Sequence, residues 1–271
     1  MRWNFSSRRR ELSRADAIII SIPKSGRTWV RTFLNAYFAY KKGKQFSLDF
    51  TDRSDAGVPR IVFSHDRFEH RTKGNAWARL RGKYLVPKRS LRHAPIVLLA
   101  RDPRDAFVSY FVQATRRNPA TPRDIKALPI HDLLRHPRFG IAAMVEVMNG
   151  WIEEFGDRSH FSIVRYEELH ADPPRAFHGL LRALGEQEID DAVFGPALDF
   201  SDFRNMQRME AAGEFGAKIL QPRDRDDPET FKVRQGKVGG FREYLSPEDQ
   251  EYAARICAGL NPRFGYEIGH K

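Results

Sequence analysis

Cysteine is almost absent from this sequence of 271 residues, in which Cys257 is the single example. One cysteine excludes an intramolecular disulfide framework, and nothing indicates a zinc site of the cysteine-rich type. Long apolar runs are also lacking, so the sequence predicts no transmembrane helix, and the short run behind the basic N-terminus makes a poor signal peptide. Repeats and low-complexity segments are missing as well. These absences favour an ordinary globular protein of the cytoplasm.

Acidic residues are fewer than basic ones. The sequence has 46 lysines and arginines against 35 aspartates and glutamates, a formal net charge of +11. Such an excess favours an anionic partner, which can be a nucleotide, a nucleic acid or an acidic surface. The length fits one α/β domain with a well-filled core. We expect residues 1–14 to form a basic arm and residues 15–271 to form the domain.

The first segment with recognisable chemistry is the apolar run 17–22, which stops at the turn Pro23–Gly26. Apolar residues at helical spacing follow, so the pattern predicts a strand, a tight loop and a helix. The first N–H groups of that helix face the loop, where together with Lys24 they form a site for a phosphate-like anion. A Walker A loop is excluded, because its lysine follows its second glycine whereas Lys24 precedes Gly26.

An arginine and a helix start follow the apolar run 95–100. The run is almost wholly apolar, as expected for a strand that is buried on both faces. Arg101 comes next, Asp102 is a good N-cap, and Pro103 suits the first helical position. Asp105 stands where it can complete the capping arrangement. The sequence therefore places Arg101 where it can bind a phosphate beside a helix N-terminus.

These two motifs, in this order, resemble those of the sulfotransferases that use 3′-phosphoadenosine-5′-phosphosulfate (PAPS). In that family Pro-Lys-Ser-Gly-Thr-Thr-Trp forms the 5′-phosphosulfate loop, and an arginine with a serine eight positions later binds the 3′-phosphate. The segment 23–29 departs from the first pattern at Arg27, while Arg101 and Ser109 match the second. The resemblance implies a single α/β domain with a mainly parallel β-sheet flanked by helices, a P-loop nucleotide-binding-like sulfotransferase fold. It also implies PAPS as the donor and 3′-phosphoadenosine-5′-phosphate (PAP) as the product.

A histidine follows the short apolar run 60–63. His65 lies at the carboxyl end of this predicted strand, the edge where parallel sheets bind ligands. The family has Lys-x-His there, and Phe63 stands in place of the lysine. The resemblance implies His65 as the general base of an in-line displacement at sulfur. It further implies that Lys24 stabilises charge on the leaving oxygen, and that Ser109 helps to hold Lys24 and the 3′-phosphate.

Later segments complete the implied nucleotide site. Tyr166 directly follows the predicted strand 161–165, at the position where the family's tyrosine contacts adenine. Segment 200–206 is similar to the family segment that covers the purine. A segment beginning at Arg234 resembles the one that closes over the 3′-phosphate, with Gln235 in place of the usual lysine. The implied cofactor-binding residues are Lys24, Ser25, Gly26, Arg27, Thr28, Trp29, Arg101, Ser109, Tyr166, Phe203, Met206, Arg234, Gln235 and Gly236.

Two stretches remain open. Residues 66–94 are long and basic, and they fit a solvated basic face as well as a wall for the acceptor. Residues 207–230 have no clear periodicity, so we expect a mobile loop over the site. The acceptor is expected to be a small molecule, a glycan or a lipid with a hydroxyl or amine group. We expect no metal, no nucleic acid and no stable membrane insertion, and the sequence assigns no oligomeric state.

Two other interpretations compete with the sulfotransferase. A P-loop kinase would also bind a nucleotide, but the sequence lacks the Walker A loop and an evident magnesium-binding hydroxyl after a P-loop lysine. A basic nucleic-acid or membrane-surface protein without catalysis would explain the net charge, but no recognisable docking motif accompanies it.

Overall fold

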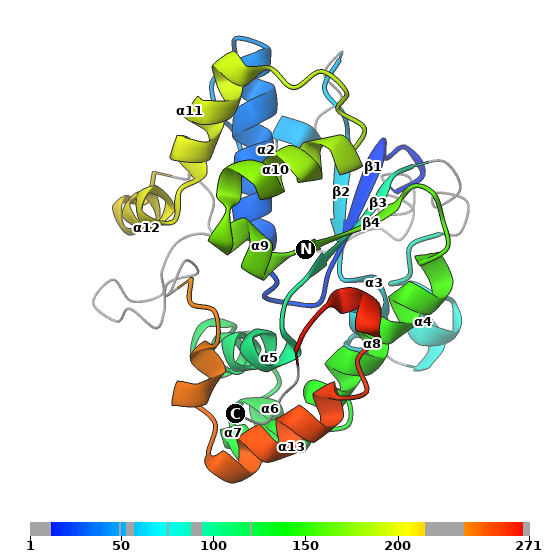
Figure 1. Ribbon diagram of the computed structural model, residues 1–271. Helices are drawn as coiled ribbons and strands as arrows, with labels where there is room; N and C mark the ends of the chain where they lie inside the picture. The colour runs from blue at the N-terminus through cyan, green and yellow to red at the C-terminus, as the bar shows by residue number, and fades with distance from the viewer. Residues whose placement is uncertain are drawn as a thin grey trace.

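The computed structural model describes residues 12–48, 50–52, 57–74, 76–87, 94–119, 121–214 and 236–267. A four-stranded sheet lies at its centre, with strand order β2-β1-β3-β4 and every neighbouring pair parallel. Figure 1 shows helices above and below this sheet. The strands are β1 (Ala17–Ile20), β2 (Ile61–Ser64), β3 (Ile96–Ala100) and β4 (Phe161–Arg165).

The helices within these described ranges run mostly between and after the strands. The α-helices are α2 (Arg27–Lys41), α3 (Asp66–Thr72), α4 (Ala76–Leu80), α5 (Pro103–Val112), α6 (Arg123–Lys126), α7 (Ile130–Arg135), α8 (Ile141–Phe155), α9 (Tyr166–Ala171), α10 (Pro173–Ala183), α11 (Asp191–Ser201), α12 (Phe203–Ala212) and α13 (Pro247–Cys257). Shorter helices are η1 (Phe50–Asp52), η5 (Gly240–Glu243) and η6 (Pro262–Phe264), all 3-10, and the π-helical η2 (Gln113–Arg117).

The central strands are buried on both faces, which explains their unbroken apolar sequences. Along β1, Ile18 packs into one apolar cluster with α5, α8 and α13, whereas Ile19 packs into the other with α2 and α10. Leu98 and Leu99 of β3 divide in the same way. Burying an isoleucine or leucine side chain stabilises the fold by about 1.5–3 kcal/mol. The predicted parallel sheet flanked by helices is therefore confirmed.

The strand order fixes where a ligand can bind. From β1 the chain crosses to β2 on one side, and it then returns past β1 to β3 on the other side. The sheet thus changes direction between β1 and β3, and ligands of open parallel sheets bind at the carboxyl ends of strands at such a switch point. The loop 21–26 and Arg101 follow these two strands directly.

The structure can be compared with the predictions for the stretches 66–94 and 207–230 and for the N-terminal arm. The basic stretch from residue 66 contains α3 and α4. The prediction of a loop from residue 207 is wrong at its start, because Met206 and Met209 pack α12 against apolar neighbours and the helix continues to Ala212. Residues 215–230 of that expected loop lie outside the described ranges, as does the expected arm up to residue 11. Within the described residues, no helix combines the length and apolarity needed to cross a membrane.

Candidate functional site

The loop between β1 and α2 has a backbone shape that few residues adopt. Lys24 and Gly26 have positive φ values of 72° and 87°, and for a lysine this conformation costs about 1–3 kcal/mol. The buried Ser25 hydroxyl donates to the carbonyl oxygen of Ile22 over 3.1 Å, so it stabilises the turn. α2 begins at Arg27 without a capping side chain from the described part of the chain. Its positive dipole end therefore points at the loop.

Gly26 is required in this loop for two reasons, its positive φ and a close neighbour. A Cβ atom on Gly26 would lie 2.6 Å from Cδ2 of Tyr166. We expect Gly26→Ala to lower the free energy of unfolding by about 2–3 kcal/mol, measured by denaturant titration. Gly43 also has positive φ but no atom near its hypothetical Cβ, so Gly43→Ala should cost only about 1 kcal/mol. Equal losses in the two variants would show that the tyrosine contact contributes nothing.

Arg101 joins three segments that lie far apart in the sequence. Its guanidinium donates to the carbonyl oxygen of Lys24 over 2.9 Å and to that of Lys237 over 3.2 Å. The same group lies 3.4 Å from the Ser109 hydroxyl and 4.3 Å above the ring of Tyr166. Arg101 is only 8% exposed, and its Nε is buried without a hydrogen-bond partner in the described part of the structure. A buried donor without a partner is costly, so this one is suited to an anionic ligand.

Asp105 anchors the segment that follows residue 235. Its carboxylate accepts hydrogen bonds from the backbone N–H groups of Gly239 at 2.7 Å and Phe241 at 2.9 Å. Burial raises the pKa of Asp105, while Arg101 and the two N–H groups oppose that rise. The expected capping role is corrected here, because within the described residues the side chain that caps α5 is that of Asp102, which accepts from the N–H of residue 104. Asp105 instead holds the segment beside Arg101.

An apolar cluster borders this anionic site. Trp29 of α2 packs with Phe203 and Met206 of α12, and the Trp29 ring meets the edge of Tyr166 at a centroid distance of 6.0 Å. A Cβ atom on Gly236 would lie 2.7 Å from the ring of Phe203. The structure therefore brings all five residues to one region. Met206 and Tyr166 are almost fully buried.

His65 lies at the N-cap of α3, directly after β2. Its Nδ1 is 2.7 Å from the backbone carbonyl oxygen of Ser21. A carbonyl only accepts hydrogen bonds, so Nδ1 carries the proton and Nε2 keeps its lone pair. Burial and then the positive charge of Arg27 lower the pKa of His65 to about 3. The imidazole is therefore neutral at physiological pH.

Two of the departures from the family pattern, Phe63 and Arg27, bear on this histidine. Phe63, which stands where the family has lysine, is buried, and the guanidinium of Arg31 lies 4.5 Å from its ring centre. Arg27, which replaces a threonine, acts electrostatically on His65. One arginine therefore lies against Phe63, and another acts on His65.

Sequence reasoning missed two functional contacts of this region. The Ser21 carbonyl that orients His65 could have been inferred from parallel pairing, since Ile20 lies opposite Ser64 in the register. The bonds from Asp105 to a segment more than 130 residues later carry no local signal. Arg234 and Gln235, predicted for the 3′-phosphate, lie outside the described residues.

Comparisons with known proteins show the family of the chain. Residues 14–265 match the family of the sulfotransferase domain. Cytosolic sulfotransferase 17 of Arabidopsis thaliana is 24% identical over 268 residues, covering 92% of this chain and 74% of the relative. The amine sulfotransferase of Oryctolagus cuniculus is 24% identical over 255 residues, covering 91% and 80%.

Solved structures share the fold. A mouse sulfotransferase, SULT7A1, complexed with PAP, aligns with a TM-score of 0.58 at 16% identity, covering 91% of this chain and 84% of its own. Retinol dehydratase in complex with androsterone and the inactive cofactor PAP aligns with a TM-score of 0.55 at 15% identity, covering 89% and 79%. Because the family match spans nearly the whole chain, this protein belongs to the sulfotransferase-domain family.

Proposed function

We propose that the protein transfers a sulfuryl group from PAPS to a hydroxyl or amine group of an acceptor, leaving PAP. Residues 15–271 would act as one domain in this reaction. The observation that carries the proposal is the placement of Arg101, whose buried guanidinium links the loop after β1, the helix after β3 and the segment after residue 235. PAP in the solved relatives supports the same nucleotide here.

The donor set suits the anionic groups of this nucleotide. Arg101 has a buried Nε without a partner among the described residues, with the Ser109 hydroxyl close to its guanidinium, and these two groups would hold the 3′-phosphate. Lys24 and the backbone N–H groups of residues 25–28, including those of Ser25, Arg27 and Thr28, would hold the 5′-phosphosulfate. Trp29, Tyr166, Phe203 and Met206 would surround the adenine, and Arg234, Gln235 and Gly236 would close over the 3′-phosphate.

When bound, PAPS supplies the sulfuryl group and an anionic leaving oxygen. His65 accepts the acceptor's proton at Nε2, while its Nδ1–H stays bonded to the Ser21 carbonyl and keeps the ring in place. Lys24 places a positive charge where negative charge develops on the leaving oxygen. Ser109 positions Arg101 at the other end of the nucleotide. His65 and Lys24 lie at the carboxyl edge of the sheet, and Ser109 lies on α5 beside Arg101.

Calorimetry with PAP and with 5′-AMP tests the nucleotide assignment. We expect PAP to bind the wild-type protein at least about 10²-fold more tightly, because a charged hydrogen bond to the 3′-phosphate is lost with AMP. Equal affinities would remove the basis of the proposal. ATP with magnesium and a DNA oligonucleotide serve as further ligands, since preferential binding of either would favour the kinase or the nucleic-acid interpretation.

We propose that the acceptor is a small molecule, a glycan or a lipid. The solved relatives include retinol dehydratase bound to androsterone or to retinol, which supports a small organic acceptor, and a glycan or lipid acceptor stays within the proposal. Several similar relatives are named cytosolic, and we propose a cytoplasmic location for this protein too.

A further inference from the structure

The segment 76–87, hereafter the α4 surface, exposes an unusual group of apolar side chains. Trp77 is 60% exposed, Leu80 78% and Leu85 37%. Within the described ranges the only other large apolar side chain exposed to this degree is Val238. Trp77 and Leu80 are three residues apart on α4 and so share a face of the helix. Single exposed apolar side chains are ordinary, but a local group of them indicates a contact with something else.

Positive charge accompanies these apolar side chains. The α4 surface carries Arg79, Arg81 and Lys83 and contains no aspartate or glutamate. The guanidinium of Arg81 lies 4.9 Å from the ring centre of Trp77, so a cation lies directly beside the exposed indole. None of the three basic side chains forms an ion pair with a carboxylate of the described residues. The α4 surface therefore combines exposed apolar side chains with positive charges that form no ion pair within the described residues.

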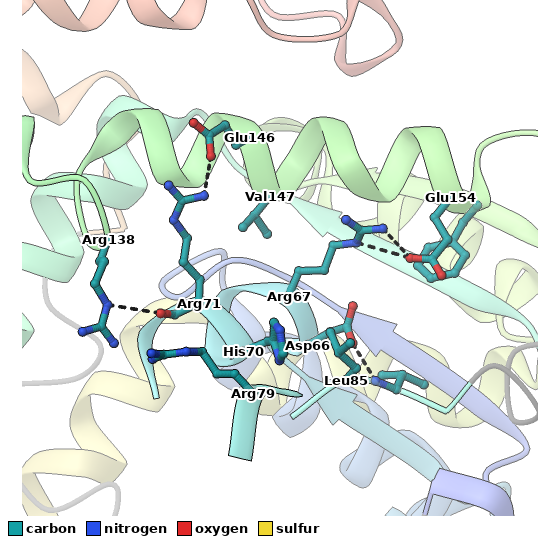
Figure 2. Close-up of a pocket in the computed structure, with 12 residues that line it drawn as sticks. Asp66, Arg67, His70, Arg71, Arg79, Leu85, Arg138, Glu146, Val147 and Glu154 are labelled. Atoms are coloured by element: carbon teal, nitrogen blue, oxygen red, sulfur yellow. Dashed lines mark hydrogen bonds and ion pairs between the residues drawn. The ribbon is translucent and has the colours of Figure 1, made fainter. Parts of the chain in front are cut away.

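A cavity of about 840 Å³ lies beside this surface, between α3, α4 and α8. Arg79 and Leu85 line it, and Figure 2 shows Arg71, Arg79 and Arg138 to the left of His70, with Arg67 and Glu154 to its right. Glu146 pairs with Arg71, but Arg79 and Arg138 bond only to backbone carbonyl oxygens within the part of the chain that the structure describes.

His70 also lines this cavity. Its Nδ1 is buried and makes no hydrogen bond within the described structure. Four arginines line the cavity together with the carboxylates of Asp66, Glu146 and Glu154. Arg67 and Arg71 pair with Glu154 and Glu146, and the two arginines without a carboxylate partner among the described residues, Arg79 and Arg138, make the cavity suitable for a phosphate group. The cavity and the α4 surface meet at Arg79, which belongs to both.

We propose that the α4 surface docks the protein on a lipid surface with anionic headgroups. Trp77 and Leu80 enter the boundary between headgroups and acyl chains, where indole rings are favoured, while Arg81 and Lys83 remain at the level of the phosphates. Arg79, at the mouth of the cavity, admits a headgroup phosphate there. The inference goes beyond the sulfuryl transfer and does not depend on it.

A protein partner explains the same features less well. A stable protein interface buries about 800 Å² on each partner. A five-residue helix with two projecting apolar side chains offers too little area for that. A lipid surface needs only a small apolar insertion assisted by several cations, and such attachment is weak and reversible.

Vesicle sedimentation tests the proposal with the full chain. We expect binding to vesicles of phosphatidylcholine with roughly one-third phosphatidylglycerol, no binding to pure phosphatidylcholine, and release at about 0.5 M salt. Each basic residue near the surface contributes a factor of about five, so Arg81→Glu with Lys83→Glu should weaken partitioning more than about 25-fold. Trp77→Ala with Leu80→Ala should weaken it about tenfold or more.

A matched control separates docking from general attraction by net charge. Arg175→Glu with Arg182→Glu makes the same charge change on exposed positions of α10, across the sheet from α4, and should leave partitioning within about twofold of wild type. Thermal unfolding midpoints show whether each variant is folded. If Trp77→Ala with Leu80→Ala does not fold, the result of Arg81→Glu with Lys83→Glu decides whether the α4 surface binds lipid. Equal loss in the α10 control, or no binding to anionic vesicles by the wild type, would overturn the proposal.

Discussion

Replacing His65 with asparagine is expected to lower turnover by about 10²- to 10⁴-fold while PAP binding stays close to wild type. Asparagine keeps an N–H group that can reach the Ser21 carbonyl, so the local fold around β1 is preserved. It has no basic nitrogen to take the acceptor's proton. The loss therefore falls on the chemical step and not on nucleotide binding.

The measurement needs an acceptor, which a screen with radiolabelled PAPS and mass identification of the products would supply. Turnover and PAP affinity are then compared for His65→Asn and His65→Ala, and for His70→Ala and His93→Ala, which test the two histidines of the stretch 66–94 as alternative bases. Ser21→Ala is a useful control, because its hydroxyl is 3.5 Å from the imidazole and the backbone carbonyl makes the shorter contact. Near-normal turnover in His65→Asn would assign the base elsewhere, and loss of PAP binding in both His65 variants would make the residue structural.

The pH dependence of kcat/KM gives an independent check on His65. Its pKa is lowered to about 3 in the free protein, mainly by burial, whereas an ordinary histidine titrates near 6.5. The neutral form that acts as a base is therefore present from about pH 3 upward, and its loss sets in only as pH falls below the range of a usual assay. We therefore expect kcat/KM to show no fall on the acid side near pH 6.5. A fall near pH 6.5 in the wild type that is missing in His65→Asn would contradict the lowered pKa of His65.

Replacing Arg101 with alanine is expected to weaken PAP binding by about 10²-fold or more, and binding of 5′-AMP by a much smaller factor. The guanidinium would provide the charged contact with the 3′-phosphate, which AMP lacks. Arg101→Lys keeps the charge but loses the planar fork that also reaches Lys24 and Lys237, so an intermediate loss of about tenfold is expected.

The ratio of the two nucleotide affinities is the quantity to measure by calorimetry. Arg101 also has structural contacts, so a fall in PAP affinity alone would not separate ligand binding from local disorder. In Arg101→Ala the ratio of PAP to AMP affinity should approach one, and in Arg182→Ala, an exposed arginine on α10, it should keep the wild-type value. An equal fall for both nucleotides in Arg101→Ala would assign the arginine a structural role only.

The parts of the fold that the sequence predicts are those with local signals. The apolar runs that end at Pro23, Ser64 and Arg101 mark three strands whose carboxyl ends meet, because parallel strands share one edge. Ser246 caps α13 as its position before a proline suggests. Each of these signals lies within a few residues of the feature that it specifies.

The remaining features depend on contacts between distant segments. Nothing near Asp105 indicates that it binds backbone N–H groups in place of capping its own helix. The ring of Tyr166 rests against Gly26, a contact that becomes visible only once β4 lies beside β3 and β3 beside β1. The lack of a clear periodicity also led to a wrong prediction at α12. The packing of Met209 there extends a helix into the segment for which a loop was expected.

The anchoring of the late segment by Asp105 and Arg101 determines when the site can form during synthesis. The partners of Asp105 come 134 and 136 residues after it in the chain, and one partner of Arg101, the carbonyl of Lys237, comes 136 residues after it. All four strands leave the ribosome soon after residue 165 is added, so the sheet can pair early. The buried side chains of Asp105 and Arg101 gain their late partners only when residues 237–241 have been synthesised. A nascent chain interrupted before that point would possess the central sheet and lack the finished anion site, which makes nucleotide binding a late event of folding.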